Sequence, residues 1–278
     1  MSFAQKLSRE QVKHVKELYH NIECTRQDIA NYLGICYNSV GHVLSYYGIN
    51  TRENAGRKKH LQSLAPKCEN VFLQETPETA YLLGYILGDG AISEVRHNLN
   101  FSSKDYQIMQ AIASVLKFPI EKIYRNVFRR EKDYICYQIN LYDAPTVQTL
   151  IQKYGFNPQK STVGCNPVIP EGLKSHYLRG LFDSDGCVRF QHKRGQPERL
   201  TVEILGHKSY IDRFITDDYS FLNFKPARYR NHFCGYMNLY KIKDVRNFYD
   251  YIYKDATIYL ERKKEIFDDH YNTRKYNF

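Results

Sequence analysis

The feature that most constrains this chain is an internal duplication that occupies its C-terminal two thirds. Four blocks recur in the same order at offsets of about 100 residues. The matched pairs are YLLGYILGDG (81–90) with YLRGLFDSDG (177–186), FSSKDY (101–106) with LGHKSY (205–210), YRNVF (from 124) with YRNHF (from 229), and INLY (from 139) with MNLY (from 237). Chance is a poor explanation of four ordered matches, so we expect two related halves.

Each half alternates helical spacing with strand-like alternation, in the order helix, hairpin, helix, hairpin, helix. In the first half the pattern predicts helices over 77–87, 106–117 and 145–154, and strands near 91–95, 99–102, 123–129 and 134–141. The second half repeats this order from residue 175, with strands near 187–191, 200–205, 227–231 and 236–240. We therefore predict an α+β fold, with the halves spanning 75–165 and 166–278.

The first helix of each half carries small residues at helical spacing. Ala80, Gly84 and Gly88 fall on one stripe, and Gly180 and Ser184 fall on the equivalent stripe. Glycine within a helix costs about 1 kcal/mol relative to alanine, so a compensating contact is expected. A close helix crossing supplies one, because small residues let two backbones approach. The stripes predict that these helices pack together as the seam between the halves.

Each of these helices ends in Asp-Gly, so the crossing would bring Asp89 and Asp185 together. A carboxylate at a helix C-terminus opposes the macrodipole by about 0.3–1 kcal/mol, and two neighbouring carboxylates repel. Divalent cations would remove both conflicts. Mg²⁺ prefers one or two carboxylates with waters and phosphate, and a bound metal can activate water for phosphodiester cleavage. We assign the metal to Asp89 and Asp185, with the preceding Gly88 and Ser184. The alternative is that the acids merely end their helices.

The paired motifs resemble those of single-chain LAGLIDADG homing endonucleases, over about residues 75–270. The resemblance implies two pseudo-symmetric αββαββα halves whose antiparallel sheets form a saddle along the DNA major groove. It also implies that the last acid of each motif binds Mg²⁺ (Mn²⁺ may substitute) near a scissile phosphate, and that cleavage leaves short 3′ overhangs. Asp183 matches the motif's earlier acid, but its counterpart is Leu87, so we expect no essential role for it.

The resemblance further implies a lysine near each site, just after the third helix of the half. Lys160 and Lys263 match, although Lys264 is an alternative to Lys263. A cation there would stabilise developing phosphate charge, and the alternative is a solvated lysine. Family members also carry a solvent-orienting polar residue at the end of each second strand, where Ser103 and His207 fall. Ser103 is a weak match.

Alternate residues of the predicted strands share a face, and these faces are rich in cations and amides. Arg and Gln side chains read guanine and adenine edges, so we predict a DNA-contacting group, against the alternative of a solvated outer face. The group consists of Ser93, Arg125, Arg129, Arg189, Gln191, Lys193, His207, Arg228, Arg230 and His232. Because the two halves differ in these residues, the predicted target is long and non-palindromic.

Residues 1–50 read as three short helices, with the string TRQDIANYLGICYNSVGHVLSYYGI typical of a DNA-binding helix-turn-helix. The alternative is an ordinary three-helix bundle. If the string binds DNA, the exposed face of the third helix enters the major groove. That face consists of Tyr37, Asn38, Ser39 and His42. Residues 51–74 form a basic linker, expected either to follow a phosphate backbone or to be a solvated strap.

The composition fits these predictions. The formal net charge of +10 favours a polyanionic partner, and no apolar run is long enough to span a membrane. Seven cysteines without a C-x-x-C pair suggest neither a disulfide framework nor a zinc site, so we expect a reduced, cytoplasmic protein of a bacterial or phage host. We predict a monomeric, metal-dependent endonuclease of double-stranded DNA. The alternatives are a non-catalytic DNA-binding regulator and an intron maturase, which would bind RNA.

Overall fold

The computed structural model describes residues 7–20, 24–49, 70–128, 134–192, 198–226 and 234–274. The chain divides into two compact units. One unit contains residues 1–66 and 125–136, and the other contains residues 67–124 and 137–278. Among the described residues, no helix is long and apolar enough to cross a membrane.

The N-terminal region folds into the three expected helices, α1 (Arg9–His20), α2 (Arg26–Leu33) and α3 (Tyr37–Tyr46). The Thr25 side chain accepts a hydrogen bond from the backbone of Asp28, whose carboxylate in turn accepts from the Thr25 backbone, so the two residues form a capping box at the start of α2. Gly34 ends α2 with a left-handed φ of 62°. The three helices enclose their own small core of Val15, Tyr19, Cys24, Ile29, Ala30, Val40, Leu44 and Ile49.

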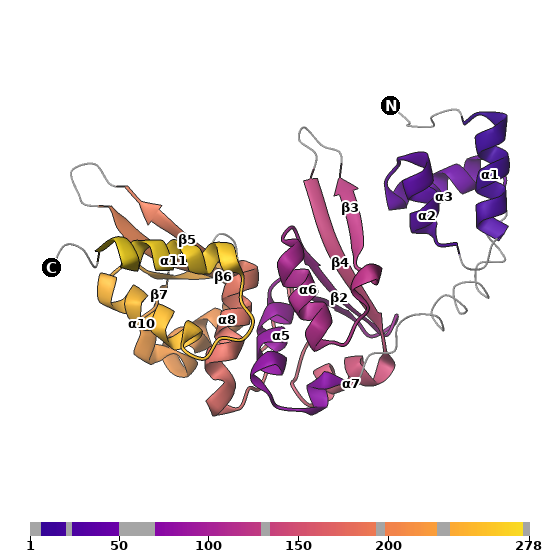
Figure 1. Ribbon diagram of the computed structural model, residues 1–278. Coiled ribbons are helices and arrows are strands. Elements are labelled where there is room, and N and C mark those ends of the chain that lie inside the picture. The colour runs from indigo at the N-terminus through magenta and orange to yellow at the C-terminus, as the bar shows by residue number, and fades with distance from the viewer. Residues whose placement is uncertain are drawn as a thin grey trace. The chain divides into compact units, whose positions relative to one another are not determined.

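The first repeated half follows the predicted order (Figure 1). Its elements are α5 (Pro77–Leu87), β1 (Ala91–Ser93), β2 (Asn98–Ser103), α6 (Tyr106–Val115), β3 (Tyr124–Phe128), β4 (Tyr134–Tyr142) and α7 (Ala144–Gln152). The strands form an antiparallel sheet in the order β1-β2-β4-β3. Helices α6 and α7 contact β2, so they cover one face of this sheet and leave the other face polar.

The second half repeats the arrangement and adds a helix. Its elements are α8 (Lys174–Asp185), β5 (Gly186–Gln191), β6 (Arg199–His207), α9 (Lys208–Arg213), β7 (Lys225–Pro226), β8 (Cys234–Leu239), α10 (Ile242–Tyr253) and α11 (Glu261–Arg274). The sheet order β5-β6-β8-β7 matches that of the first half. The predicted α+β fold and the duplication are thus confirmed, whereas α11 was not anticipated.

Some boundaries differ from the prediction for local reasons. Helix α6 ends at Val115 because Lys117 takes a left-handed φ of 52°, and α7 ends at Gln152, before Gly155 at φ 73°. The second helix of the second half is not α-helical throughout: after six residues α9 continues as a π-helix over Phe214–Asp218. Asp218, its last residue, pairs with Lys174 and Arg213. The strand predicted near 227–231 lies outside the described residues, and β7 (Lys225–Pro226) ends just before it.

Helices α5 and α8 pack directly against each other and form the predicted seam (Figure 1). A Cβ on Gly84 would collide with the backbone oxygen of Tyr177, and one on Gly180 would collide with that of Tyr81. Only glycine permits this approach, so the backbone contact offsets its helical cost. The core surrounds the seam, with every residue of α5 from Thr79 to Leu87 buried.

Candidate active site

The two motif acids lie at the same end of the seam. Asp89 follows Gly88, the residue at which α5 ends, and Asp185 is the last residue of α8. Gly88 lies against Ser184, and a Cβ on Gly88 would come within 3.1 Å of the Asp185 carboxyl carbon. The helix crossing therefore brings the second acid to the C-terminal turn of the first helix, as the small-residue stripes predicted.

The carboxyls of Asp89 and Asp185 both have raised pKa values at this end of the seam. Burial raises the pKa of Asp185 to about 6, and the negative charge of Asp89 adds to this shift. Desolvation also raises the pKa of Asp89, while Lys263 and Lys160 oppose the increase. Both acids are thus harder to ionise than a solvated aspartate, because burial outweighs the attraction of the two lysines.

The donor set at this position suits Mg²⁺. The protein groups that meet at this end of the seam are the two carboxylates of Asp89 and Asp185, and among the described residues no third His, Cys, Asp or Glu joins them as a ligand. Mg²⁺ typically binds through one or two carboxylates and keeps several waters. The Gly88 carbonyl already accepts from Lys160, and the Ser184 hydroxyl donates to Gly180 and Leu181 of its own helix. The carbonyl oxygen of Gly88 has a second lone pair, so the assignment of Gly88 and Ser184 to the metal stays a prediction.

A lysine lies against each motif helix end: Lys160 is half-buried and Lys263 is buried. The Lys160 Nζ donates to the carbonyls of Leu87 and Gly88 at 2.7 and 2.6 Å. The Lys263 Nζ donates to three carbonyls, those of Phe182 and Gly186 at 2.6 Å and that of Asp183 at 2.8 Å. These groups include final-turn carbonyls of α5 and α8, which lack intrahelical partners. Each lysine thus satisfies the helix end that bears a motif acid.

The surroundings of Lys263 and Lys264, which the sequence left as alternatives, differ in the structure. Lys263 is 4% exposed, and burial lowers its pKa to about 8, opposed mainly by Asp183. Burial also lowers the pKa of Lys160, opposed by Asp185 and Asp89. Lys264 instead pairs with Asp268 at 2.6 Å on its own helix. Lys160 and Lys263 therefore do not have the surroundings of freely solvated lysines.

Ser103 and His207 occupy the ends of the second strands, β2 and β6. The Ser103 hydroxyl accepts from the backbone of Asp105, and the His207 Nδ1 lies 2.9 Å from the Ser209 hydroxyl. Gly164 packs so closely on His207 that a Cβ there would collide with the ring. Both side chains are half-buried at the strand ends, and their solvent-orienting role stays a prediction.

The outward sheet faces carry the predicted cations in the second half. Arg189 and Gln191 are exposed on β5, opposite Thr201 and Arg199 of β6, and Arg189 lies 3.5 Å from Glu203. In the first half Arg125 is exposed and Ser93 is half-buried. Five of the predicted contacts fall outside the described residues: Arg129, Lys193, Arg228, Arg230 and His232.

The outward face of the first sheet is rich in amides that the sequence reasoning missed. Its half-buried polar residues on β2 and β4 are Asn98, Asn100, Ser102, Gln138 and Asn140. Asn100 pairs with Asn140 across the strands, and its amide donates to the Asn140 side chain at 2.9 Å. The available signal was their strict alternation with the buried Leu99, Phe101, Ile139 and Leu141.

On α3, the predicted recognition face is mostly accessible. Tyr37, Asn38 and His42 are exposed, whereas Ser39 is half-buried with its hydroxyl 3.0 Å from the Cys36 sulfur.

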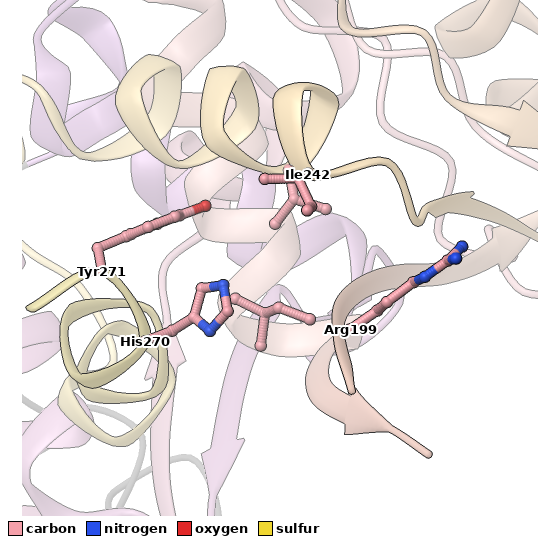
Figure 2. Close-up of a pocket in the computed structure, with 6 residues that line it drawn as sticks. Arg199, Ile242, His270 and Tyr271 are labelled. Carbon is pink, nitrogen blue, oxygen red and sulfur yellow. The ribbon is translucent and has the colours of Figure 1, made fainter. Parts of the chain in front are cut away.

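In the second half, Figure 2 shows Arg199, Ile242, His270 and Tyr271 around a small hollow. None of the proposed catalytic residues lines it.

Comparison with known families gives one domain match. Residues 76–158 match the model of the LAGLIDADG-like domain. A segment covering 46% of the chain is 26% identical over 149 residues to the ribonucleoside-diphosphate reductase NrdEB subunit alpha of Bacillus subtilis (strain 168). The nrdEB subunit alpha of Bacillus phage SPbeta gives the same values. The match spans 13% of the length of each of these relatives.

Similar solved structures include two nucleases that contain DNA. The LAGLIDADG meganuclease I-AabMI bound to uncleaved DNA is 16% identical with a TM-score of 0.46, covering 69% of this chain and 88% of that one. The I-LtrWI LAGLIDADG homing endonuclease bound to target DNA is 12% identical with a TM-score of 0.48, covering 72% and 91%. Full-length DUF199/WhiA from Thermatoga maritima is 19% identical with a TM-score of 0.44, covering 76% and 63%.

Proposed function

Because residues 76–158 form a LAGLIDADG-like domain, we propose that this protein is a site-specific endonuclease that hydrolyses both strands of double-stranded DNA with a divalent metal. The observation that carries the proposal is the pair of carboxyls at one end of the glycine seam, where a lysine also donates to the carbonyls of each helix end. Two acids in unfavourable surroundings, repeated in both halves, are expected of function rather than of folding.

In this proposal, Asp89 and Asp185 hold Mg²⁺ or Mn²⁺ between the protein and the DNA backbone. When bound, the metal would supply an activated water and stabilise the leaving oxygen. Lys160 and Lys263 fix the helix ends on which the acids stand, and their positive charge favours an approaching phosphate. The gap between the sites would produce short 3′ overhangs.

The sheets would provide target recognition. Their outward faces present arginine and glutamine in the second half and amides in the first, and these groups read base edges in the major groove. Because the faces differ, a long non-palindromic site fits better than an inverted repeat. The exposed residues of α3 would add major-groove contacts, and the net charge of +10 favours the phosphate backbone. Both acids come from one chain, so a monomer suffices.

The decisive experiment replaces each motif acid without changing its size. In Asp89→Asn and Asp185→Asn, we expect loss of double-strand cleavage with Mg²⁺ while DNA affinity stays within about threefold, because binding rests mainly on phosphate and base contacts. Asp250→Asn is the matched control, since Asp250 pairs with Arg246 on the surface of α10. Cleavage and gel-shift assays on a site selected from a randomised library give both readouts.

The same assays distinguish the alternative of a non-catalytic DNA-binding protein. If the wild-type protein binds its selected site but never cuts it with Mg²⁺ or Mn²⁺, the endonuclease proposal is wrong and a binding scaffold remains. Wild-type cleavage by either acid variant would instead refute the assignment of the catalytic carboxylates.

A further inference from the structure

Asp183 is a buried carboxylate that joins three elements at the second helix end. It is 3% exposed. Its Oδ2 accepts from the hydroxyl of Tyr81 on α5 at 2.8 Å and from the backbone N–H of Leu260 at 2.8 Å. Leu260 directly precedes α11, and its carbonyl accepts from the backbone of Lys263. Asp183 therefore anchors the first turn of the helix that carries Lys263.

Arg179, one turn earlier on α8, holds the connection that leads into α11. It is 1% exposed. Its guanidinium donates to the carbonyl of Ile252, near the end of α10, at 2.7 Å and to that of Ile258 at 2.8 Å. A third nitrogen lies 2.9 Å from the His176 Nδ1. The planar guanidinium of Arg179 thus holds the segment between α10 and α11 by hydrogen bonds near its start and near its end.

Three contacts tie this connection and α11 to the first half. Besides the Tyr81–Asp183 hydrogen bond, the Thr257 hydroxyl donates to Glu78 at 2.7 Å. At the start of α11, Arg262 donates to both carboxylate oxygens of Asp105 at 3.1 Å. The backbone around Lys263 is therefore fixed by both halves.

The first half has no such arrangement. The positions equivalent to Arg179 and Asp183 are Leu83 and Leu87, both buried and apolar. Lys160 follows α7 after a short turn in which its backbone donates to Asn157. Since apolar side chains fill these positions in a half of the same fold, packing alone does not require the buried charges. Buried charges also carry a desolvation cost that well-packed apolar residues avoid.

We propose that Asp183 and Arg179 are positioning residues: they hold residues 252–260 so that the Lys263 ammonium stays on the end of α8. Because Asp183 also accepts a hydrogen bond from Tyr81 on α5, the position of residues 252–260 depends on the first half as well. The consequence for cleavage rests on the proposed endonuclease function. Only the strand cut beside Lys263 should depend on this cluster, whereas the strand cut beside Lys160 should not.

The first test measures Lys263 itself, by quantitative acetylation and mass spectrometry of the full chain. Replacing Asp183 with the residue of the other half, Asp183→Leu, should accelerate Lys263 acetylation at least about tenfold, the ordinary consequence of losing a hydrogen bond to a charged group. Asp183→Asn keeps an oxygen that can accept the Leu260 N–H but removes the charge that opposes the lowered pKa of Lys263, so it should accelerate acetylation less than Asp183→Leu does. If Asp183→Leu does not fold, Tyr81→Phe removes one hydrogen bond and should accelerate acetylation to a smaller extent.

The matched control is Asp244→Leu. Asp244 is a buried aspartate in α10 of the same half. Its carboxylate accepts a hydrogen bond from the side-chain amide of Asn223. This variant should leave Lys263 acetylation unchanged. Equal acceleration in Asp244→Leu, or none in a folded Asp183→Leu, would overturn the positioning role.

The second test resolves the two DNA strands in single-turnover cleavage. Asp183→Leu should slow one strand at least about tenfold, leave the other at the wild-type rate and bind DNA within about threefold of wild type. Equal slowing of both strands would overturn the strand-specific role. If wild-type protein cuts no DNA, the endonuclease proposal fails, and the acetylation test still decides the positioning proposal.

Discussion

Asp185 carries the strongest electrostatic conflict of the two motif acids. Burial and the charge of Asp89 raise its pKa to about 6, from an ordinary value of 3.8. A carboxyl with a raised pKa binds its proton more tightly in the folded state. Its contribution to stability is complete below about pH 4 and is lost as pH rises through about 6. At neutral pH the ionised Asp185 therefore weakens the metal-free fold.

A residue-scale prediction follows from this sign. In metal-free buffer at about pH 7.5, Asp185→Asn should be more stable than wild type by up to about 3 kcal/mol, and the gain should shrink toward zero at about pH 4. Thermal unfolding across this pH range measures it. The pKa of Asp183 is also raised to about 6 by burial. Because Asp183 is present in both proteins, its effect on stability cancels in the difference between them.

Added Mg²⁺ should reverse the order. A ligand that binds only the folded state raises its stability, so the midpoint of wild-type unfolding should rise with Mg²⁺ while that of Asp185→Asn stays nearly constant. An equal response of the two proteins would show that Asp185 does not bind the metal.

At the scale of elements, the α5–α8 seam is a backbone-to-backbone contact. Gly84→Ala places a methyl group where the Tyr177 carbonyl lies, so the helices must separate. Overpacking of this kind typically costs about 1–3 kcal/mol, and we expect the upper end because the neighbour is backbone. Urea unfolding measures the loss. Gly172→Ala is the control, since a Cβ at Gly172 meets nothing within 4 Å and should change stability little.

The elements near the seam were the most predictable from sequence. The bounds of α5 were predicted to the residue, because Pro77 opens the helix and Asp-Gly follows its end. The strands of the first hairpin followed from alternation. The predictable part of the candidate site was the pair of acids, whose places the duplicated motif specifies, and one lysine per half, which the family resemblance implied.

What could not be predicted depends on contacts between distant segments. Asp218, at the end of the π-helix that continues α9, pairs with Lys174 and Arg213, and no local sequence pattern predicts these pairs. The role of Asp183 was missed because comparison with Leu87 suggested that the position was dispensable. Its partners, Tyr81 and the Leu260 backbone, lie 102 and 77 residues away in the sequence.

For the molecule as a whole, the proposal predicts the length and symmetry of the DNA site. Selection from a randomised library should yield a non-palindromic site, because the two sheet faces carry different base-reading groups. In the double variant Asn38→Ala/His42→Ala, the selected site should become shorter and the affinity should fall at least about fivefold, since these exposed α3 residues would no longer read bases. An unchanged site would contradict the helix-turn-helix assignment.

The seam also has a consequence for exchanging parts between such proteins. Its closest contacts join glycines to backbone carbonyl oxygens of the other helix. Any helix with the same small residues can make these contacts, so halves taken from two different proteins of this fold should assemble readily. The Tyr81–Asp183 hydrogen bond is different, because it has a direction: α5 gives the hydroxyl and α8 gives the acid. A chimera assembled from two N-terminal halves would place tyrosine opposite leucine there. Parts taken from this chain should therefore retain their original order to keep both candidate sites intact.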